Sequence, residues 1–128
     1  MACFWNGILS QLSPADFLPF GLEKKPKPKQ FVLLLQINNV RTSAVSCQGT
    51  RLTEQQMEEN YQSVEGYDKE KVNDGYLCSS SDPFLFLVSE IFLVDIDHKY
   101  LNKIIQYRHV RGKRTLHFQS NKSHFQPA

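Results

Sequence analysis

The chain has 128 residues, of which 41% are hydrophobic and 12% aromatic, and its formal net charge is +2. This length and composition predict a single folded domain over residues 1–128 and exclude a disordered chain. No apolar run approaches the roughly 20 residues of a membrane-spanning helix, so we expect no membrane association. The first ten residues carry no basic charge and no cleavage pattern, so we expect no signal peptide. Three cysteines without metal-type spacing indicate a reducing compartment.

The charge is distributed unevenly along the chain. Residues 49–97 carry eleven acidic and three basic side chains, whereas residues 98–128 carry seven basic side chains and no acidic one. A basic segment of this kind is compatible with nucleic-acid binding. The same split is expected if the two segments face each other in the fold, or if the strands have solvated outer faces. Nucleic acid is therefore the less favoured partner.

The N-terminal part of the chain predicts helices. Phe4, Ile8 and Leu12 recur at i, i+4 and i+8, which is the apolar face of a helix over residues 3–12. Ser13-Pro14 is typical of a second helix start. That helix is expected to be short, because a proline and a glycine follow it.

The middle of the chain predicts two helices separated by loops. After the charged connector at residues 23–30, the apolar run 31–40 is compatible with a buried strand or a buried helix, and its leucines favour a helix. Residues 41–52 are expected to form a loop. Thr53 and Gln56 then make a capping box for a helix that ends at Gly66. Residues 67–81 are polar and rich in turn formers.

The last third of the chain predicts one helix followed by strands. Asp82 as the N-cap and Pro83 at the first position begin that helix. Strands are expected where apolar and polar residues alternate, at 94–98, 104–110, 115–120 and from 125 onward. Residues 111–114 are expected to turn between two neighbouring strands. The order predicts an α+β fold, in which a small antiparallel sheet, formed mainly by the C-terminal half, packs against N-terminal and central helices.

Cys3 is the first candidate for chemistry, because it stands at the head of the first predicted helix. The unpaired N–H groups at a helix start favour a thiolate, and they can hold an oxyanion during acyl transfer. The other reading is a small buried side chain near a frayed terminus. Cys47 and Cys78 lie in predicted loops, head no predicted helix, and are expected to be ordinary thiols.

His124 is the second candidate, because it follows a turn and begins the last predicted strand. Pairing of that strand would fix its backbone and leave the ring free to face a cleft. A cysteine nucleophile needs an imidazole held in this way, oriented by a third polar group. Gln126, on the same strand face, and Asn121, across the turn, are the candidates for that group. Packing or surface roles are expected for the other histidines, His98, His109 and His117.

No metal site is predicted from the spacing of the histidines and cysteines. Asp95 and Asp97 share one face of a predicted strand and could hold a cation. The simpler interpretation is that they form the solvated face of that strand.

The order of these features resembles the ovarian-tumour (OTU) family of cysteine proteases, which cleave ubiquitin or ubiquitin-like proteins from conjugates. Cys3-Phe4 at the head of the first helix matches the family's cysteine-aromatic position. His124-Phe125 matches its histidine-aromatic position in a terminal strand. Between them, the polar loop 74–78 precedes a helix with the sequence PFLFLVSEIF. The likeness in order covers nearly the whole chain, and the short length resembles viral members.

The resemblance implies a papain-like OTU-type architecture and a deubiquitinase activity. Cys3 would be the nucleophile and His124 the general base, oriented by Gln126 or Asn121. It implies no cofactor, a monomer, ubiquitin or ubiquitin-like conjugates as partners, and the cytoplasm as location, that of the host for a viral protein. The acidic residues 54–97 would suit the basic C-terminal tail of ubiquitin. The residues expected to contact the substrate are Tyr76, Asp74 and Trp5.

Two departures from the family pattern keep alternatives open. Only Met1 and Ala2 precede Cys3, where the family has an Asp-Gly-Asn segment that shapes the oxyanion hole. Tyr76-Leu77-Cys78 stands where the family has a Trp-Gly-Gly-type segment. The first alternative is a non-catalytic ubiquitin- or protein-binding module on the same fold, with a degenerate site. The second is a nucleic-acid-binding α+β domain that uses residues 98–122.

Overall fold

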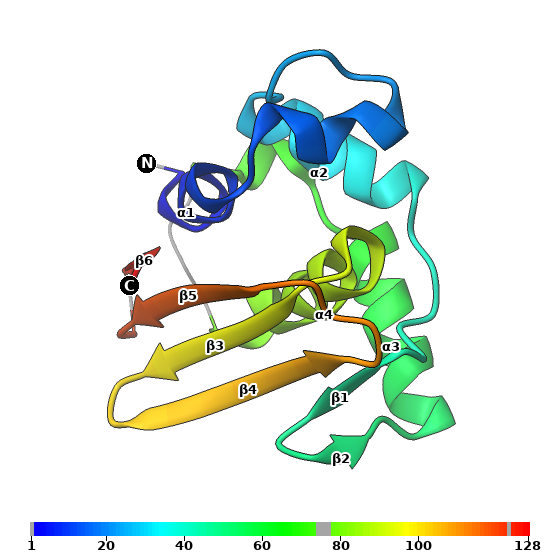
Figure 1. Ribbon diagram of the computed structural model, residues 1–128, viewed down its shortest axis with the longest axis vertical. Coiled ribbons are helices and arrows are strands. Elements are labelled where there is room, and N and C mark those ends of the chain that lie inside the picture. Colours follow the sequence, from blue (N-terminus) through cyan, green and yellow to red (C-terminus); the bar gives the residue numbers. More distant parts are fainter. Residues whose placement is uncertain (1, 74–77, 123) are drawn as a thin grey trace.

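One six-stranded mixed sheet organises the fold (Figure 1). The computed structural model describes residues 2–73, 78–122 and 124–128, with only the backbone of residues 78–80. Within these residues the strand order is β2-β1-β4-β3-β5-β6. The strands are β1 (Val45–Cys47), β2 (Thr50–Arg51), β3 (Asp95–Tyr100), β4 (Lys103–His109), β5 (Thr115–Ser120) and β6 (Phe125–Pro127). The helical elements are α1 (Cys3–Gln11), η1 (Pro14–Phe20), α2 (Pro28–Ile37), α3 (Glu54–Glu65), η2 (Lys69–Lys71) and α4 (Cys78–Phe92).

The predicted helices of the N-terminal half are confirmed, and their ends follow the expected chemistry. In η1, a short 3₁₀ helix, the Ser13 N–H donates to Asp16 Oδ2 at 2.7 Å. Of the run at residues 31–40, residues 31–37 are helical within α2, which ends at Ile37. At the start of α3, the Gln56 N–H donates to Thr53 Oγ1 at 3.1 Å and the Thr53 N–H donates to Gln56 Oε1 at 2.8 Å. Local capping therefore sets these helix starts.

The loop predicted at residues 41–52 is wrong, because this segment contains the β1–β2 hairpin. Gln48 and Gly49 form its turn, with φ angles of 54° and 78°. The Gln48 side chain joins the hairpin to β4, since its amide donates to the Ile104 carbonyl at 2.9 Å and its oxygen accepts from the Gln106 N–H at 3.0 Å. Strands of two and three residues are too short for an alternating pattern to be seen in the sequence.

The predicted start of the central helix is also wrong. α4 begins at Cys78, so Pro83 lies inside the helix and Asp82 is not its N-cap. The Asp82 carboxylate is used elsewhere, because it accepts a hydrogen bond from the Tyr107 hydroxyl of β4. Burial raises the pKa of Asp82 above its usual range, against the lowering effect of that hydrogen bond. The Asp82 side chain, which the sequence pattern predicts to cap a helix, instead makes a tertiary contact with β4.

The sheet is mixed, so the prediction of an antiparallel sheet holds only for part of it. β3 pairs with β4 in antiparallel fashion and with β5 in parallel fashion. Residues 111–114 do not turn between neighbouring strands. They cross the start of β3, where the Lys113 N–H donates to the Leu93 carbonyl at 2.9 Å and the Asp95 N–H donates to the Arg114 carbonyl at 2.8 Å. This crossing places β5 on the far side of β3.

The two faces of the sheet differ in character. One face is buried against α1 and α4 through Ile96, Tyr107, Phe118 and Phe125, and it belongs to one continuous hydrophobic core. In Figure 1, α3 and α4 lie behind the strands and α1 lies next to β6 at the sheet edge. The alternate positions form the other face, where Arg108 and Asp97 form an ion pair with an N–O distance of 2.8 Å. The predicted solvated face therefore holds only in part, because Asp97 is half-buried in this ion pair and Asp95 Oδ1 accepts a hydrogen bond from the His109 N–H at 2.8 Å.

Candidate functional site

Cys3 is the first residue of α1 and carries a free, half-buried thiol. The residue before it, Ala2, has no side-chain oxygen, so this helix start lacks a side-chain cap of the kind that Thr53 gives to α3. The Ala2 carbonyl accepts the first bond of the helix, from the Asn6 N–H at 2.9 Å. The first turn also holds no acidic side chain. The backbone N–H groups around Cys3 are therefore well placed to stabilise negative charge.

His124 ends the tight turn between β5 and β6. The His124 N–H donates to Asn121 Oδ1 at 2.9 Å, and the Asn121 N–H donates to the His124 carbonyl at 3.0 Å. The ring Nε2 lies 3.2 Å from Gln126 Oε1. Because an amide oxygen only accepts, this contact fits the tautomer that carries its proton on Nε2 and leaves Nδ1 unprotonated. Both residues predicted to orient His124 are in contact with it, Asn121 through the backbone and Gln126 through the ring.

α1 is docked directly against β6. The rings of Phe4 and Phe125 meet edge to face, with centroids 4.8 Å apart. A Cβ atom on Gly7 would lie 3.0 Å from the Phe125 ring, so a glycine permits this close approach. At the other end of α1, Gln11 Oε1 accepts from the His117 N–H at 2.9 Å. The helix headed by Cys3 is thus held against β6 and β5, the two strands that flank His124.

The thiol and the imidazole form no hydrogen bond with each other among the described contacts. Phe125 faces α1, whereas Gln126 of β6 and His124, the residue before β6, point to the other side. On that face His124 lines a shallow cavity of about 250 Å³ together with Lys99, Gln119 and Gln126. The structure therefore brings the elements of the predicted pair together, while the reacting atoms are not joined in this conformation.

Trp5 was predicted to contact a substrate, and its burial argues against that role. Only 3% of its surface is exposed. Its ring packs against Phe31, Tyr67 and Phe84, and its N–H donates to the Tyr67 hydroxyl at 3.3 Å. Trp5 is a core residue that anchors α1 to the rest of the fold. The other predicted substrate-contacting residues, Asp74 and Tyr76, lie outside the described residues.

The three histidines expected to have packing or surface roles have such roles. His98 is buried, its Nε2 lies 2.6 Å from Ser120 Oγ, and burial lowers its pKa to about 4. His109 is buried beside Glu90, with 3.6 Å between Nε2 and the carboxylate. His117 is exposed on the open face of the sheet. Neither buried ring faces solvent, so neither replaces His124 as a candidate base.

The other cysteines give one confirmation and one correction. Cys47 lies half-buried in β1, and burial, with a smaller contribution from Asp82, raises the pKa of its thiol. A raised pKa keeps the thiol protonated, as expected for an ordinary cysteine. Cys78, in contrast, is the first residue of α4, so the expectation that it heads no helix is wrong. A test of Cys3 as nucleophile therefore needs Cys78 as a control.

Features that only tertiary structure reveals were missed by the sequence. Gly7 contacts β6, and its one sequence signal is a glycine inside a helical pattern, which often marks a close approach.

Among the described residues, no group of three or more histidine, cysteine or carboxylate side chains is arranged to hold a metal ion. No helix of that described part combines the length and the apolar character needed to cross a membrane. Comparison with protein-family models, with curated proteins and with solved structures finds no match to this chain.

Proposed function

We propose that the chain is an OTU-type cysteine protease with a papain-like architecture, which hydrolyses the isopeptide bond after the C-terminal tail of ubiquitin or a ubiquitin-like protein. One observation carries the proposal. The helix headed by Cys3 packs on the strand that follows His124, through Phe4 and Phe125, while Gln126 Oε1 lies on the ring Nε2 of His124. A nucleophile at a helix start, a histidine on a fixed backbone and a third polar group are the parts that such a protease needs.

The proposed reaction begins with proton transfer from the Cys3 thiol to His124 Nδ1. The thiolate attacks the carbonyl carbon of the isopeptide bond, and the N–H groups at the start of α1 hold the resulting oxyanion. Collapse of this intermediate breaks the C–N bond, and His124 gives its proton to the leaving lysine amine. Water, deprotonated by His124, then attacks the thioester, which releases the ubiquitin carboxylate and restores the thiol. Gln126 keeps the ring in the required tautomer throughout.

The missing hydrogen bond between thiol and imidazole bears on this proposal. The His124 ring lies on the side of the terminal strand turned away from α1, so the proposed proton transfer needs His124 to move toward Cys3 and not only a shorter hydrogen bond. The same observation favours a second candidate function, in which the fold binds ubiquitin or another protein without cleaving it. The two candidates predict different fates for the Cys3 sulfur.

Charge contributes less to the proposal than geometry. Several acidic residues of the segment 54–97 are already paired within the fold. Arg41 approaches Glu54 and Glu58 at 3.5 and 2.7 Å, and Lys29 pairs with Glu70 at 2.6 Å. Exposed pairs of this kind can exchange partners at small cost. The proposed location remains a reducing compartment, the cytoplasm or, for a viral protein, that of the host, with the protein acting as a monomer.

The test is covalent labelling by ubiquitin and ubiquitin-like proteins that end in an electrophile. We expect labelling of the wild-type chain and of the Cys47→Ala and Cys78→Ala variants, and no labelling of Cys3→Ala. His124→Ala should label at least about a hundredfold more slowly, because the base is lost. Circular dichroism of each variant checks that it is folded.

Each other outcome has a defined meaning. A wild-type chain that binds ubiquitin reversibly but is never labelled supports the binding module and overturns the protease. Labelling that survives in Cys3→Ala and disappears in Cys78→Ala moves the nucleophile to α4. A chain that neither binds nor reacts with any of the probes overturns both candidates.

A further inference from the structure

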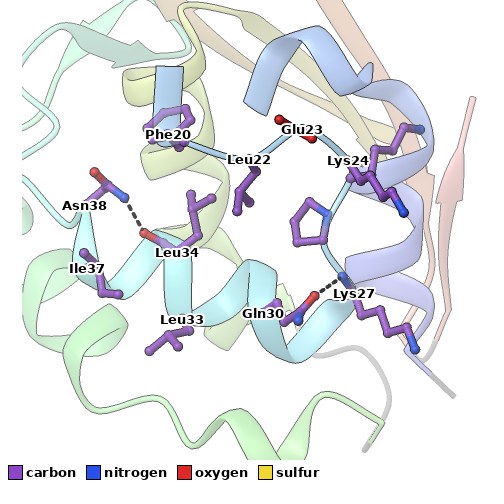
Figure 2. A pocket seen from close by; sticks show the side chains of 13 residues that line it. Phe20, Leu22, Glu23, Lys24, Lys27, Gln30, Leu33, Leu34, Ile37 and Asn38 are labelled. Atoms are coloured by element: carbon purple, nitrogen blue, oxygen red, sulfur yellow. Dashed lines mark hydrogen bonds between the residues drawn. The ribbon is translucent and has the colours of Figure 1, made fainter. Parts of the chain in front are cut away.

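A groove of about 720 Å³ lies between α2 and the segment 20–27 that leads into it (Figure 2). One wall is the outer side of α2, and the other is the connector that runs beside it. Figure 2 shows the apolar side chains gathered at one end and in the middle of the groove. These side chains are Phe20, Leu22, Leu33, Leu34 and Ile37. The groove lies apart from the proposed active site, so a ligand of this groove is independent of the proposed function.

The outer side of α2 is an apolar ridge that the described part of the chain leaves open. Leu33 and Ile37 stand one helical turn apart, with 44% and 73% of their surface exposed. The opposite side of α2 is buried in the core through Phe31 and Leu35. Large apolar side chains exposed singly are common, but a pair aligned along a groove marks an interaction surface. Leu33 and Ile37 have the i, i+4 spacing of a helix–helix contact.

Positive charge lies at one end of the same groove. Lys24 and Lys27 stand at the end away from Ile37 and Asn38 (Figure 2). Neither lysine forms an ion pair with any described carboxylate. Lys25 is held elsewhere, because its ammonium group donates to the Leu9 carbonyl at the end of α1 at 2.9 Å. Glu23 is the one carboxylate among the lining residues. A ligand with an apolar stripe and negative charge near one end complements this surface.

We propose that this groove binds an amphipathic helix of a partner protein, with its apolar stripe against Leu33 and Ile37 and its acidic residues beside Lys24 and Lys27. α2 has ten residues, which correspond to about 15 Å and to about three turns of a facing helix. Helices in apolar grooves use anchors at i, i+3, i+4 and i+7, which match the ridge. The opposite charges would speed association and exclude basic helices.

The positions of the lysines favour a helix over an anionic membrane surface. A helix that lies on a membrane carries basic residues along both edges of its apolar face. Here Lys24 and Lys27 lie at one end only. The apolar surface is a groove, and Leu33 and Ile37 of α2 line one of its walls. A bilayer cannot follow that shape, whereas the side chains of a single helix fill it.

The test is a selection of displayed peptides on the full chain. The library holds helical peptides of about 16 residues with a fixed leucine stripe, and with Glu, Lys or Gln varied at the flanking positions. We expect enrichment of Glu over Lys. Selected peptides should bind Ile37→Asp at least about tenfold more weakly, because a central anchor is lost. The double variant Lys24→Glu, Lys27→Glu should instead select Lys.

Controls make each outcome decisive. Ile104→Asp alters another exposed isoleucine, on β4 and 54% exposed, and should leave peptide binding unchanged. The proposal is overturned if the wild-type chain enriches leucine-stripe peptides no more than Ile37→Asp does. It is also overturned if the peptides selected on the wild-type chain prefer Lys to Glu at the flanking positions. Binding to phosphatidylserine vesicles that Ile37→Asp abolishes, while no peptide is enriched, overturns it as well. Self-association that Ile37→Asp removes, seen by sedimentation, would assign the groove to a second copy and also overturn it.

Discussion

α1 and α2 are helices of nine and ten residues that both bury an apolar face in the same core. They differ in what covers the rest of their surface. β6 lies against α1, and the Phe125 ring fills the space beside Phe4 and Gly7. No described element covers the outer ridge of α2, where Leu33 and Ile37 are exposed. A helix fixed by an edge strand suits chemistry that needs rigid positions. A helix with an open ridge suits recognition.

Removing the ring that covers α1 should have the largest effect. Phe125→Ala deletes a fully buried side chain that contacts Phe4, Phe118 and His98, with centroids 4.8, 4.8 and 5.3 Å away. We expect the free energy of unfolding to fall by about 3–5 kcal/mol, because apolar contact is lost and a cavity remains. Urea denaturation measures the change. A loss below about 1 kcal/mol would mean that β6 is not held against α1.

Acid should weaken the same corner through His98, which lies under Phe125. Burial lowers the pKa of His98 to about 4, whereas an exposed histidine in the unfolded chain titrates near about 6.5. Protonation therefore favours the unfolded chain, so this contribution to stability is complete above about pH 6.5 and falls as the pH drops toward 4. The full loss is of order 3 kcal/mol.

The measurement compares denaturation curves of wild type and His98→Gln between pH 7 and about pH 4. The variant should lose stability less steeply, because the titrating group is gone. His117→Gln replaces an exposed histidine on the neighbouring strand and is the matched control. Equal slopes for wild type and His98→Gln would contradict the buried, neutral state of His98.

Adding a side chain to α1 should also weaken its contact with β6, by crowding Phe125 instead of removing its ring. In Gly7→Val the new Cβ alone would lie 3.0 Å from the Phe125 ring, so we expect a loss of about 1–3 kcal/mol from overpacking. Asn6→Val adds the same side chain to an exposed position of the same helix and controls for helix propensity. The contact is refuted if the two variants lose the same stability in thermal denaturation.

A substitution on the open ridge of α2 should change the free energy of unfolding least. Ile37→Gln replaces a side chain that is 73% exposed, and we expect the free energy of unfolding to change by no more than about 0.5 kcal/mol. Urea denaturation beside Phe125→Ala gives the contrast between the two helices directly. A loss above about 2 kcal/mol would show that part of this chain covers the ridge and would remove the case for a docking groove.

Much of the fold could be predicted from the sequence where local chemistry decides it. The capping pair Thr53–Gln56, the Ser13 helix start and the alternation in β3 and β5 were each read correctly. The errors have a common cause, because tertiary contacts decided those positions. Asp82 accepts a hydrogen bond from Tyr107 instead of capping a helix. Residues 111–114 cross β3 instead of connecting two strands that pair with each other.

The candidate site divides in the same way. Cys3 at a helix start and His124 after a turn follow from local pattern, and so does the proximity of Gln126, two residues along one strand. The sequence could not give the docking of α1 on β6, since the two segments lie at opposite ends of the chain. It also misassigned Trp5, because an aromatic residue next to a candidate nucleophile has the same local pattern whether it faces solvent or the core.

Cleavage of isopeptide-linked diubiquitin tests the central claim most directly. The proposal predicts that the wild-type chain and the Cys47→Ala and Cys78→Ala variants release monomeric ubiquitin from at least one linkage type, and that Cys3→Ala, folded to the same extent, releases none. Persistent cleavage by Cys3→Ala, or no cleavage of any linkage by the wild-type chain, would contradict it.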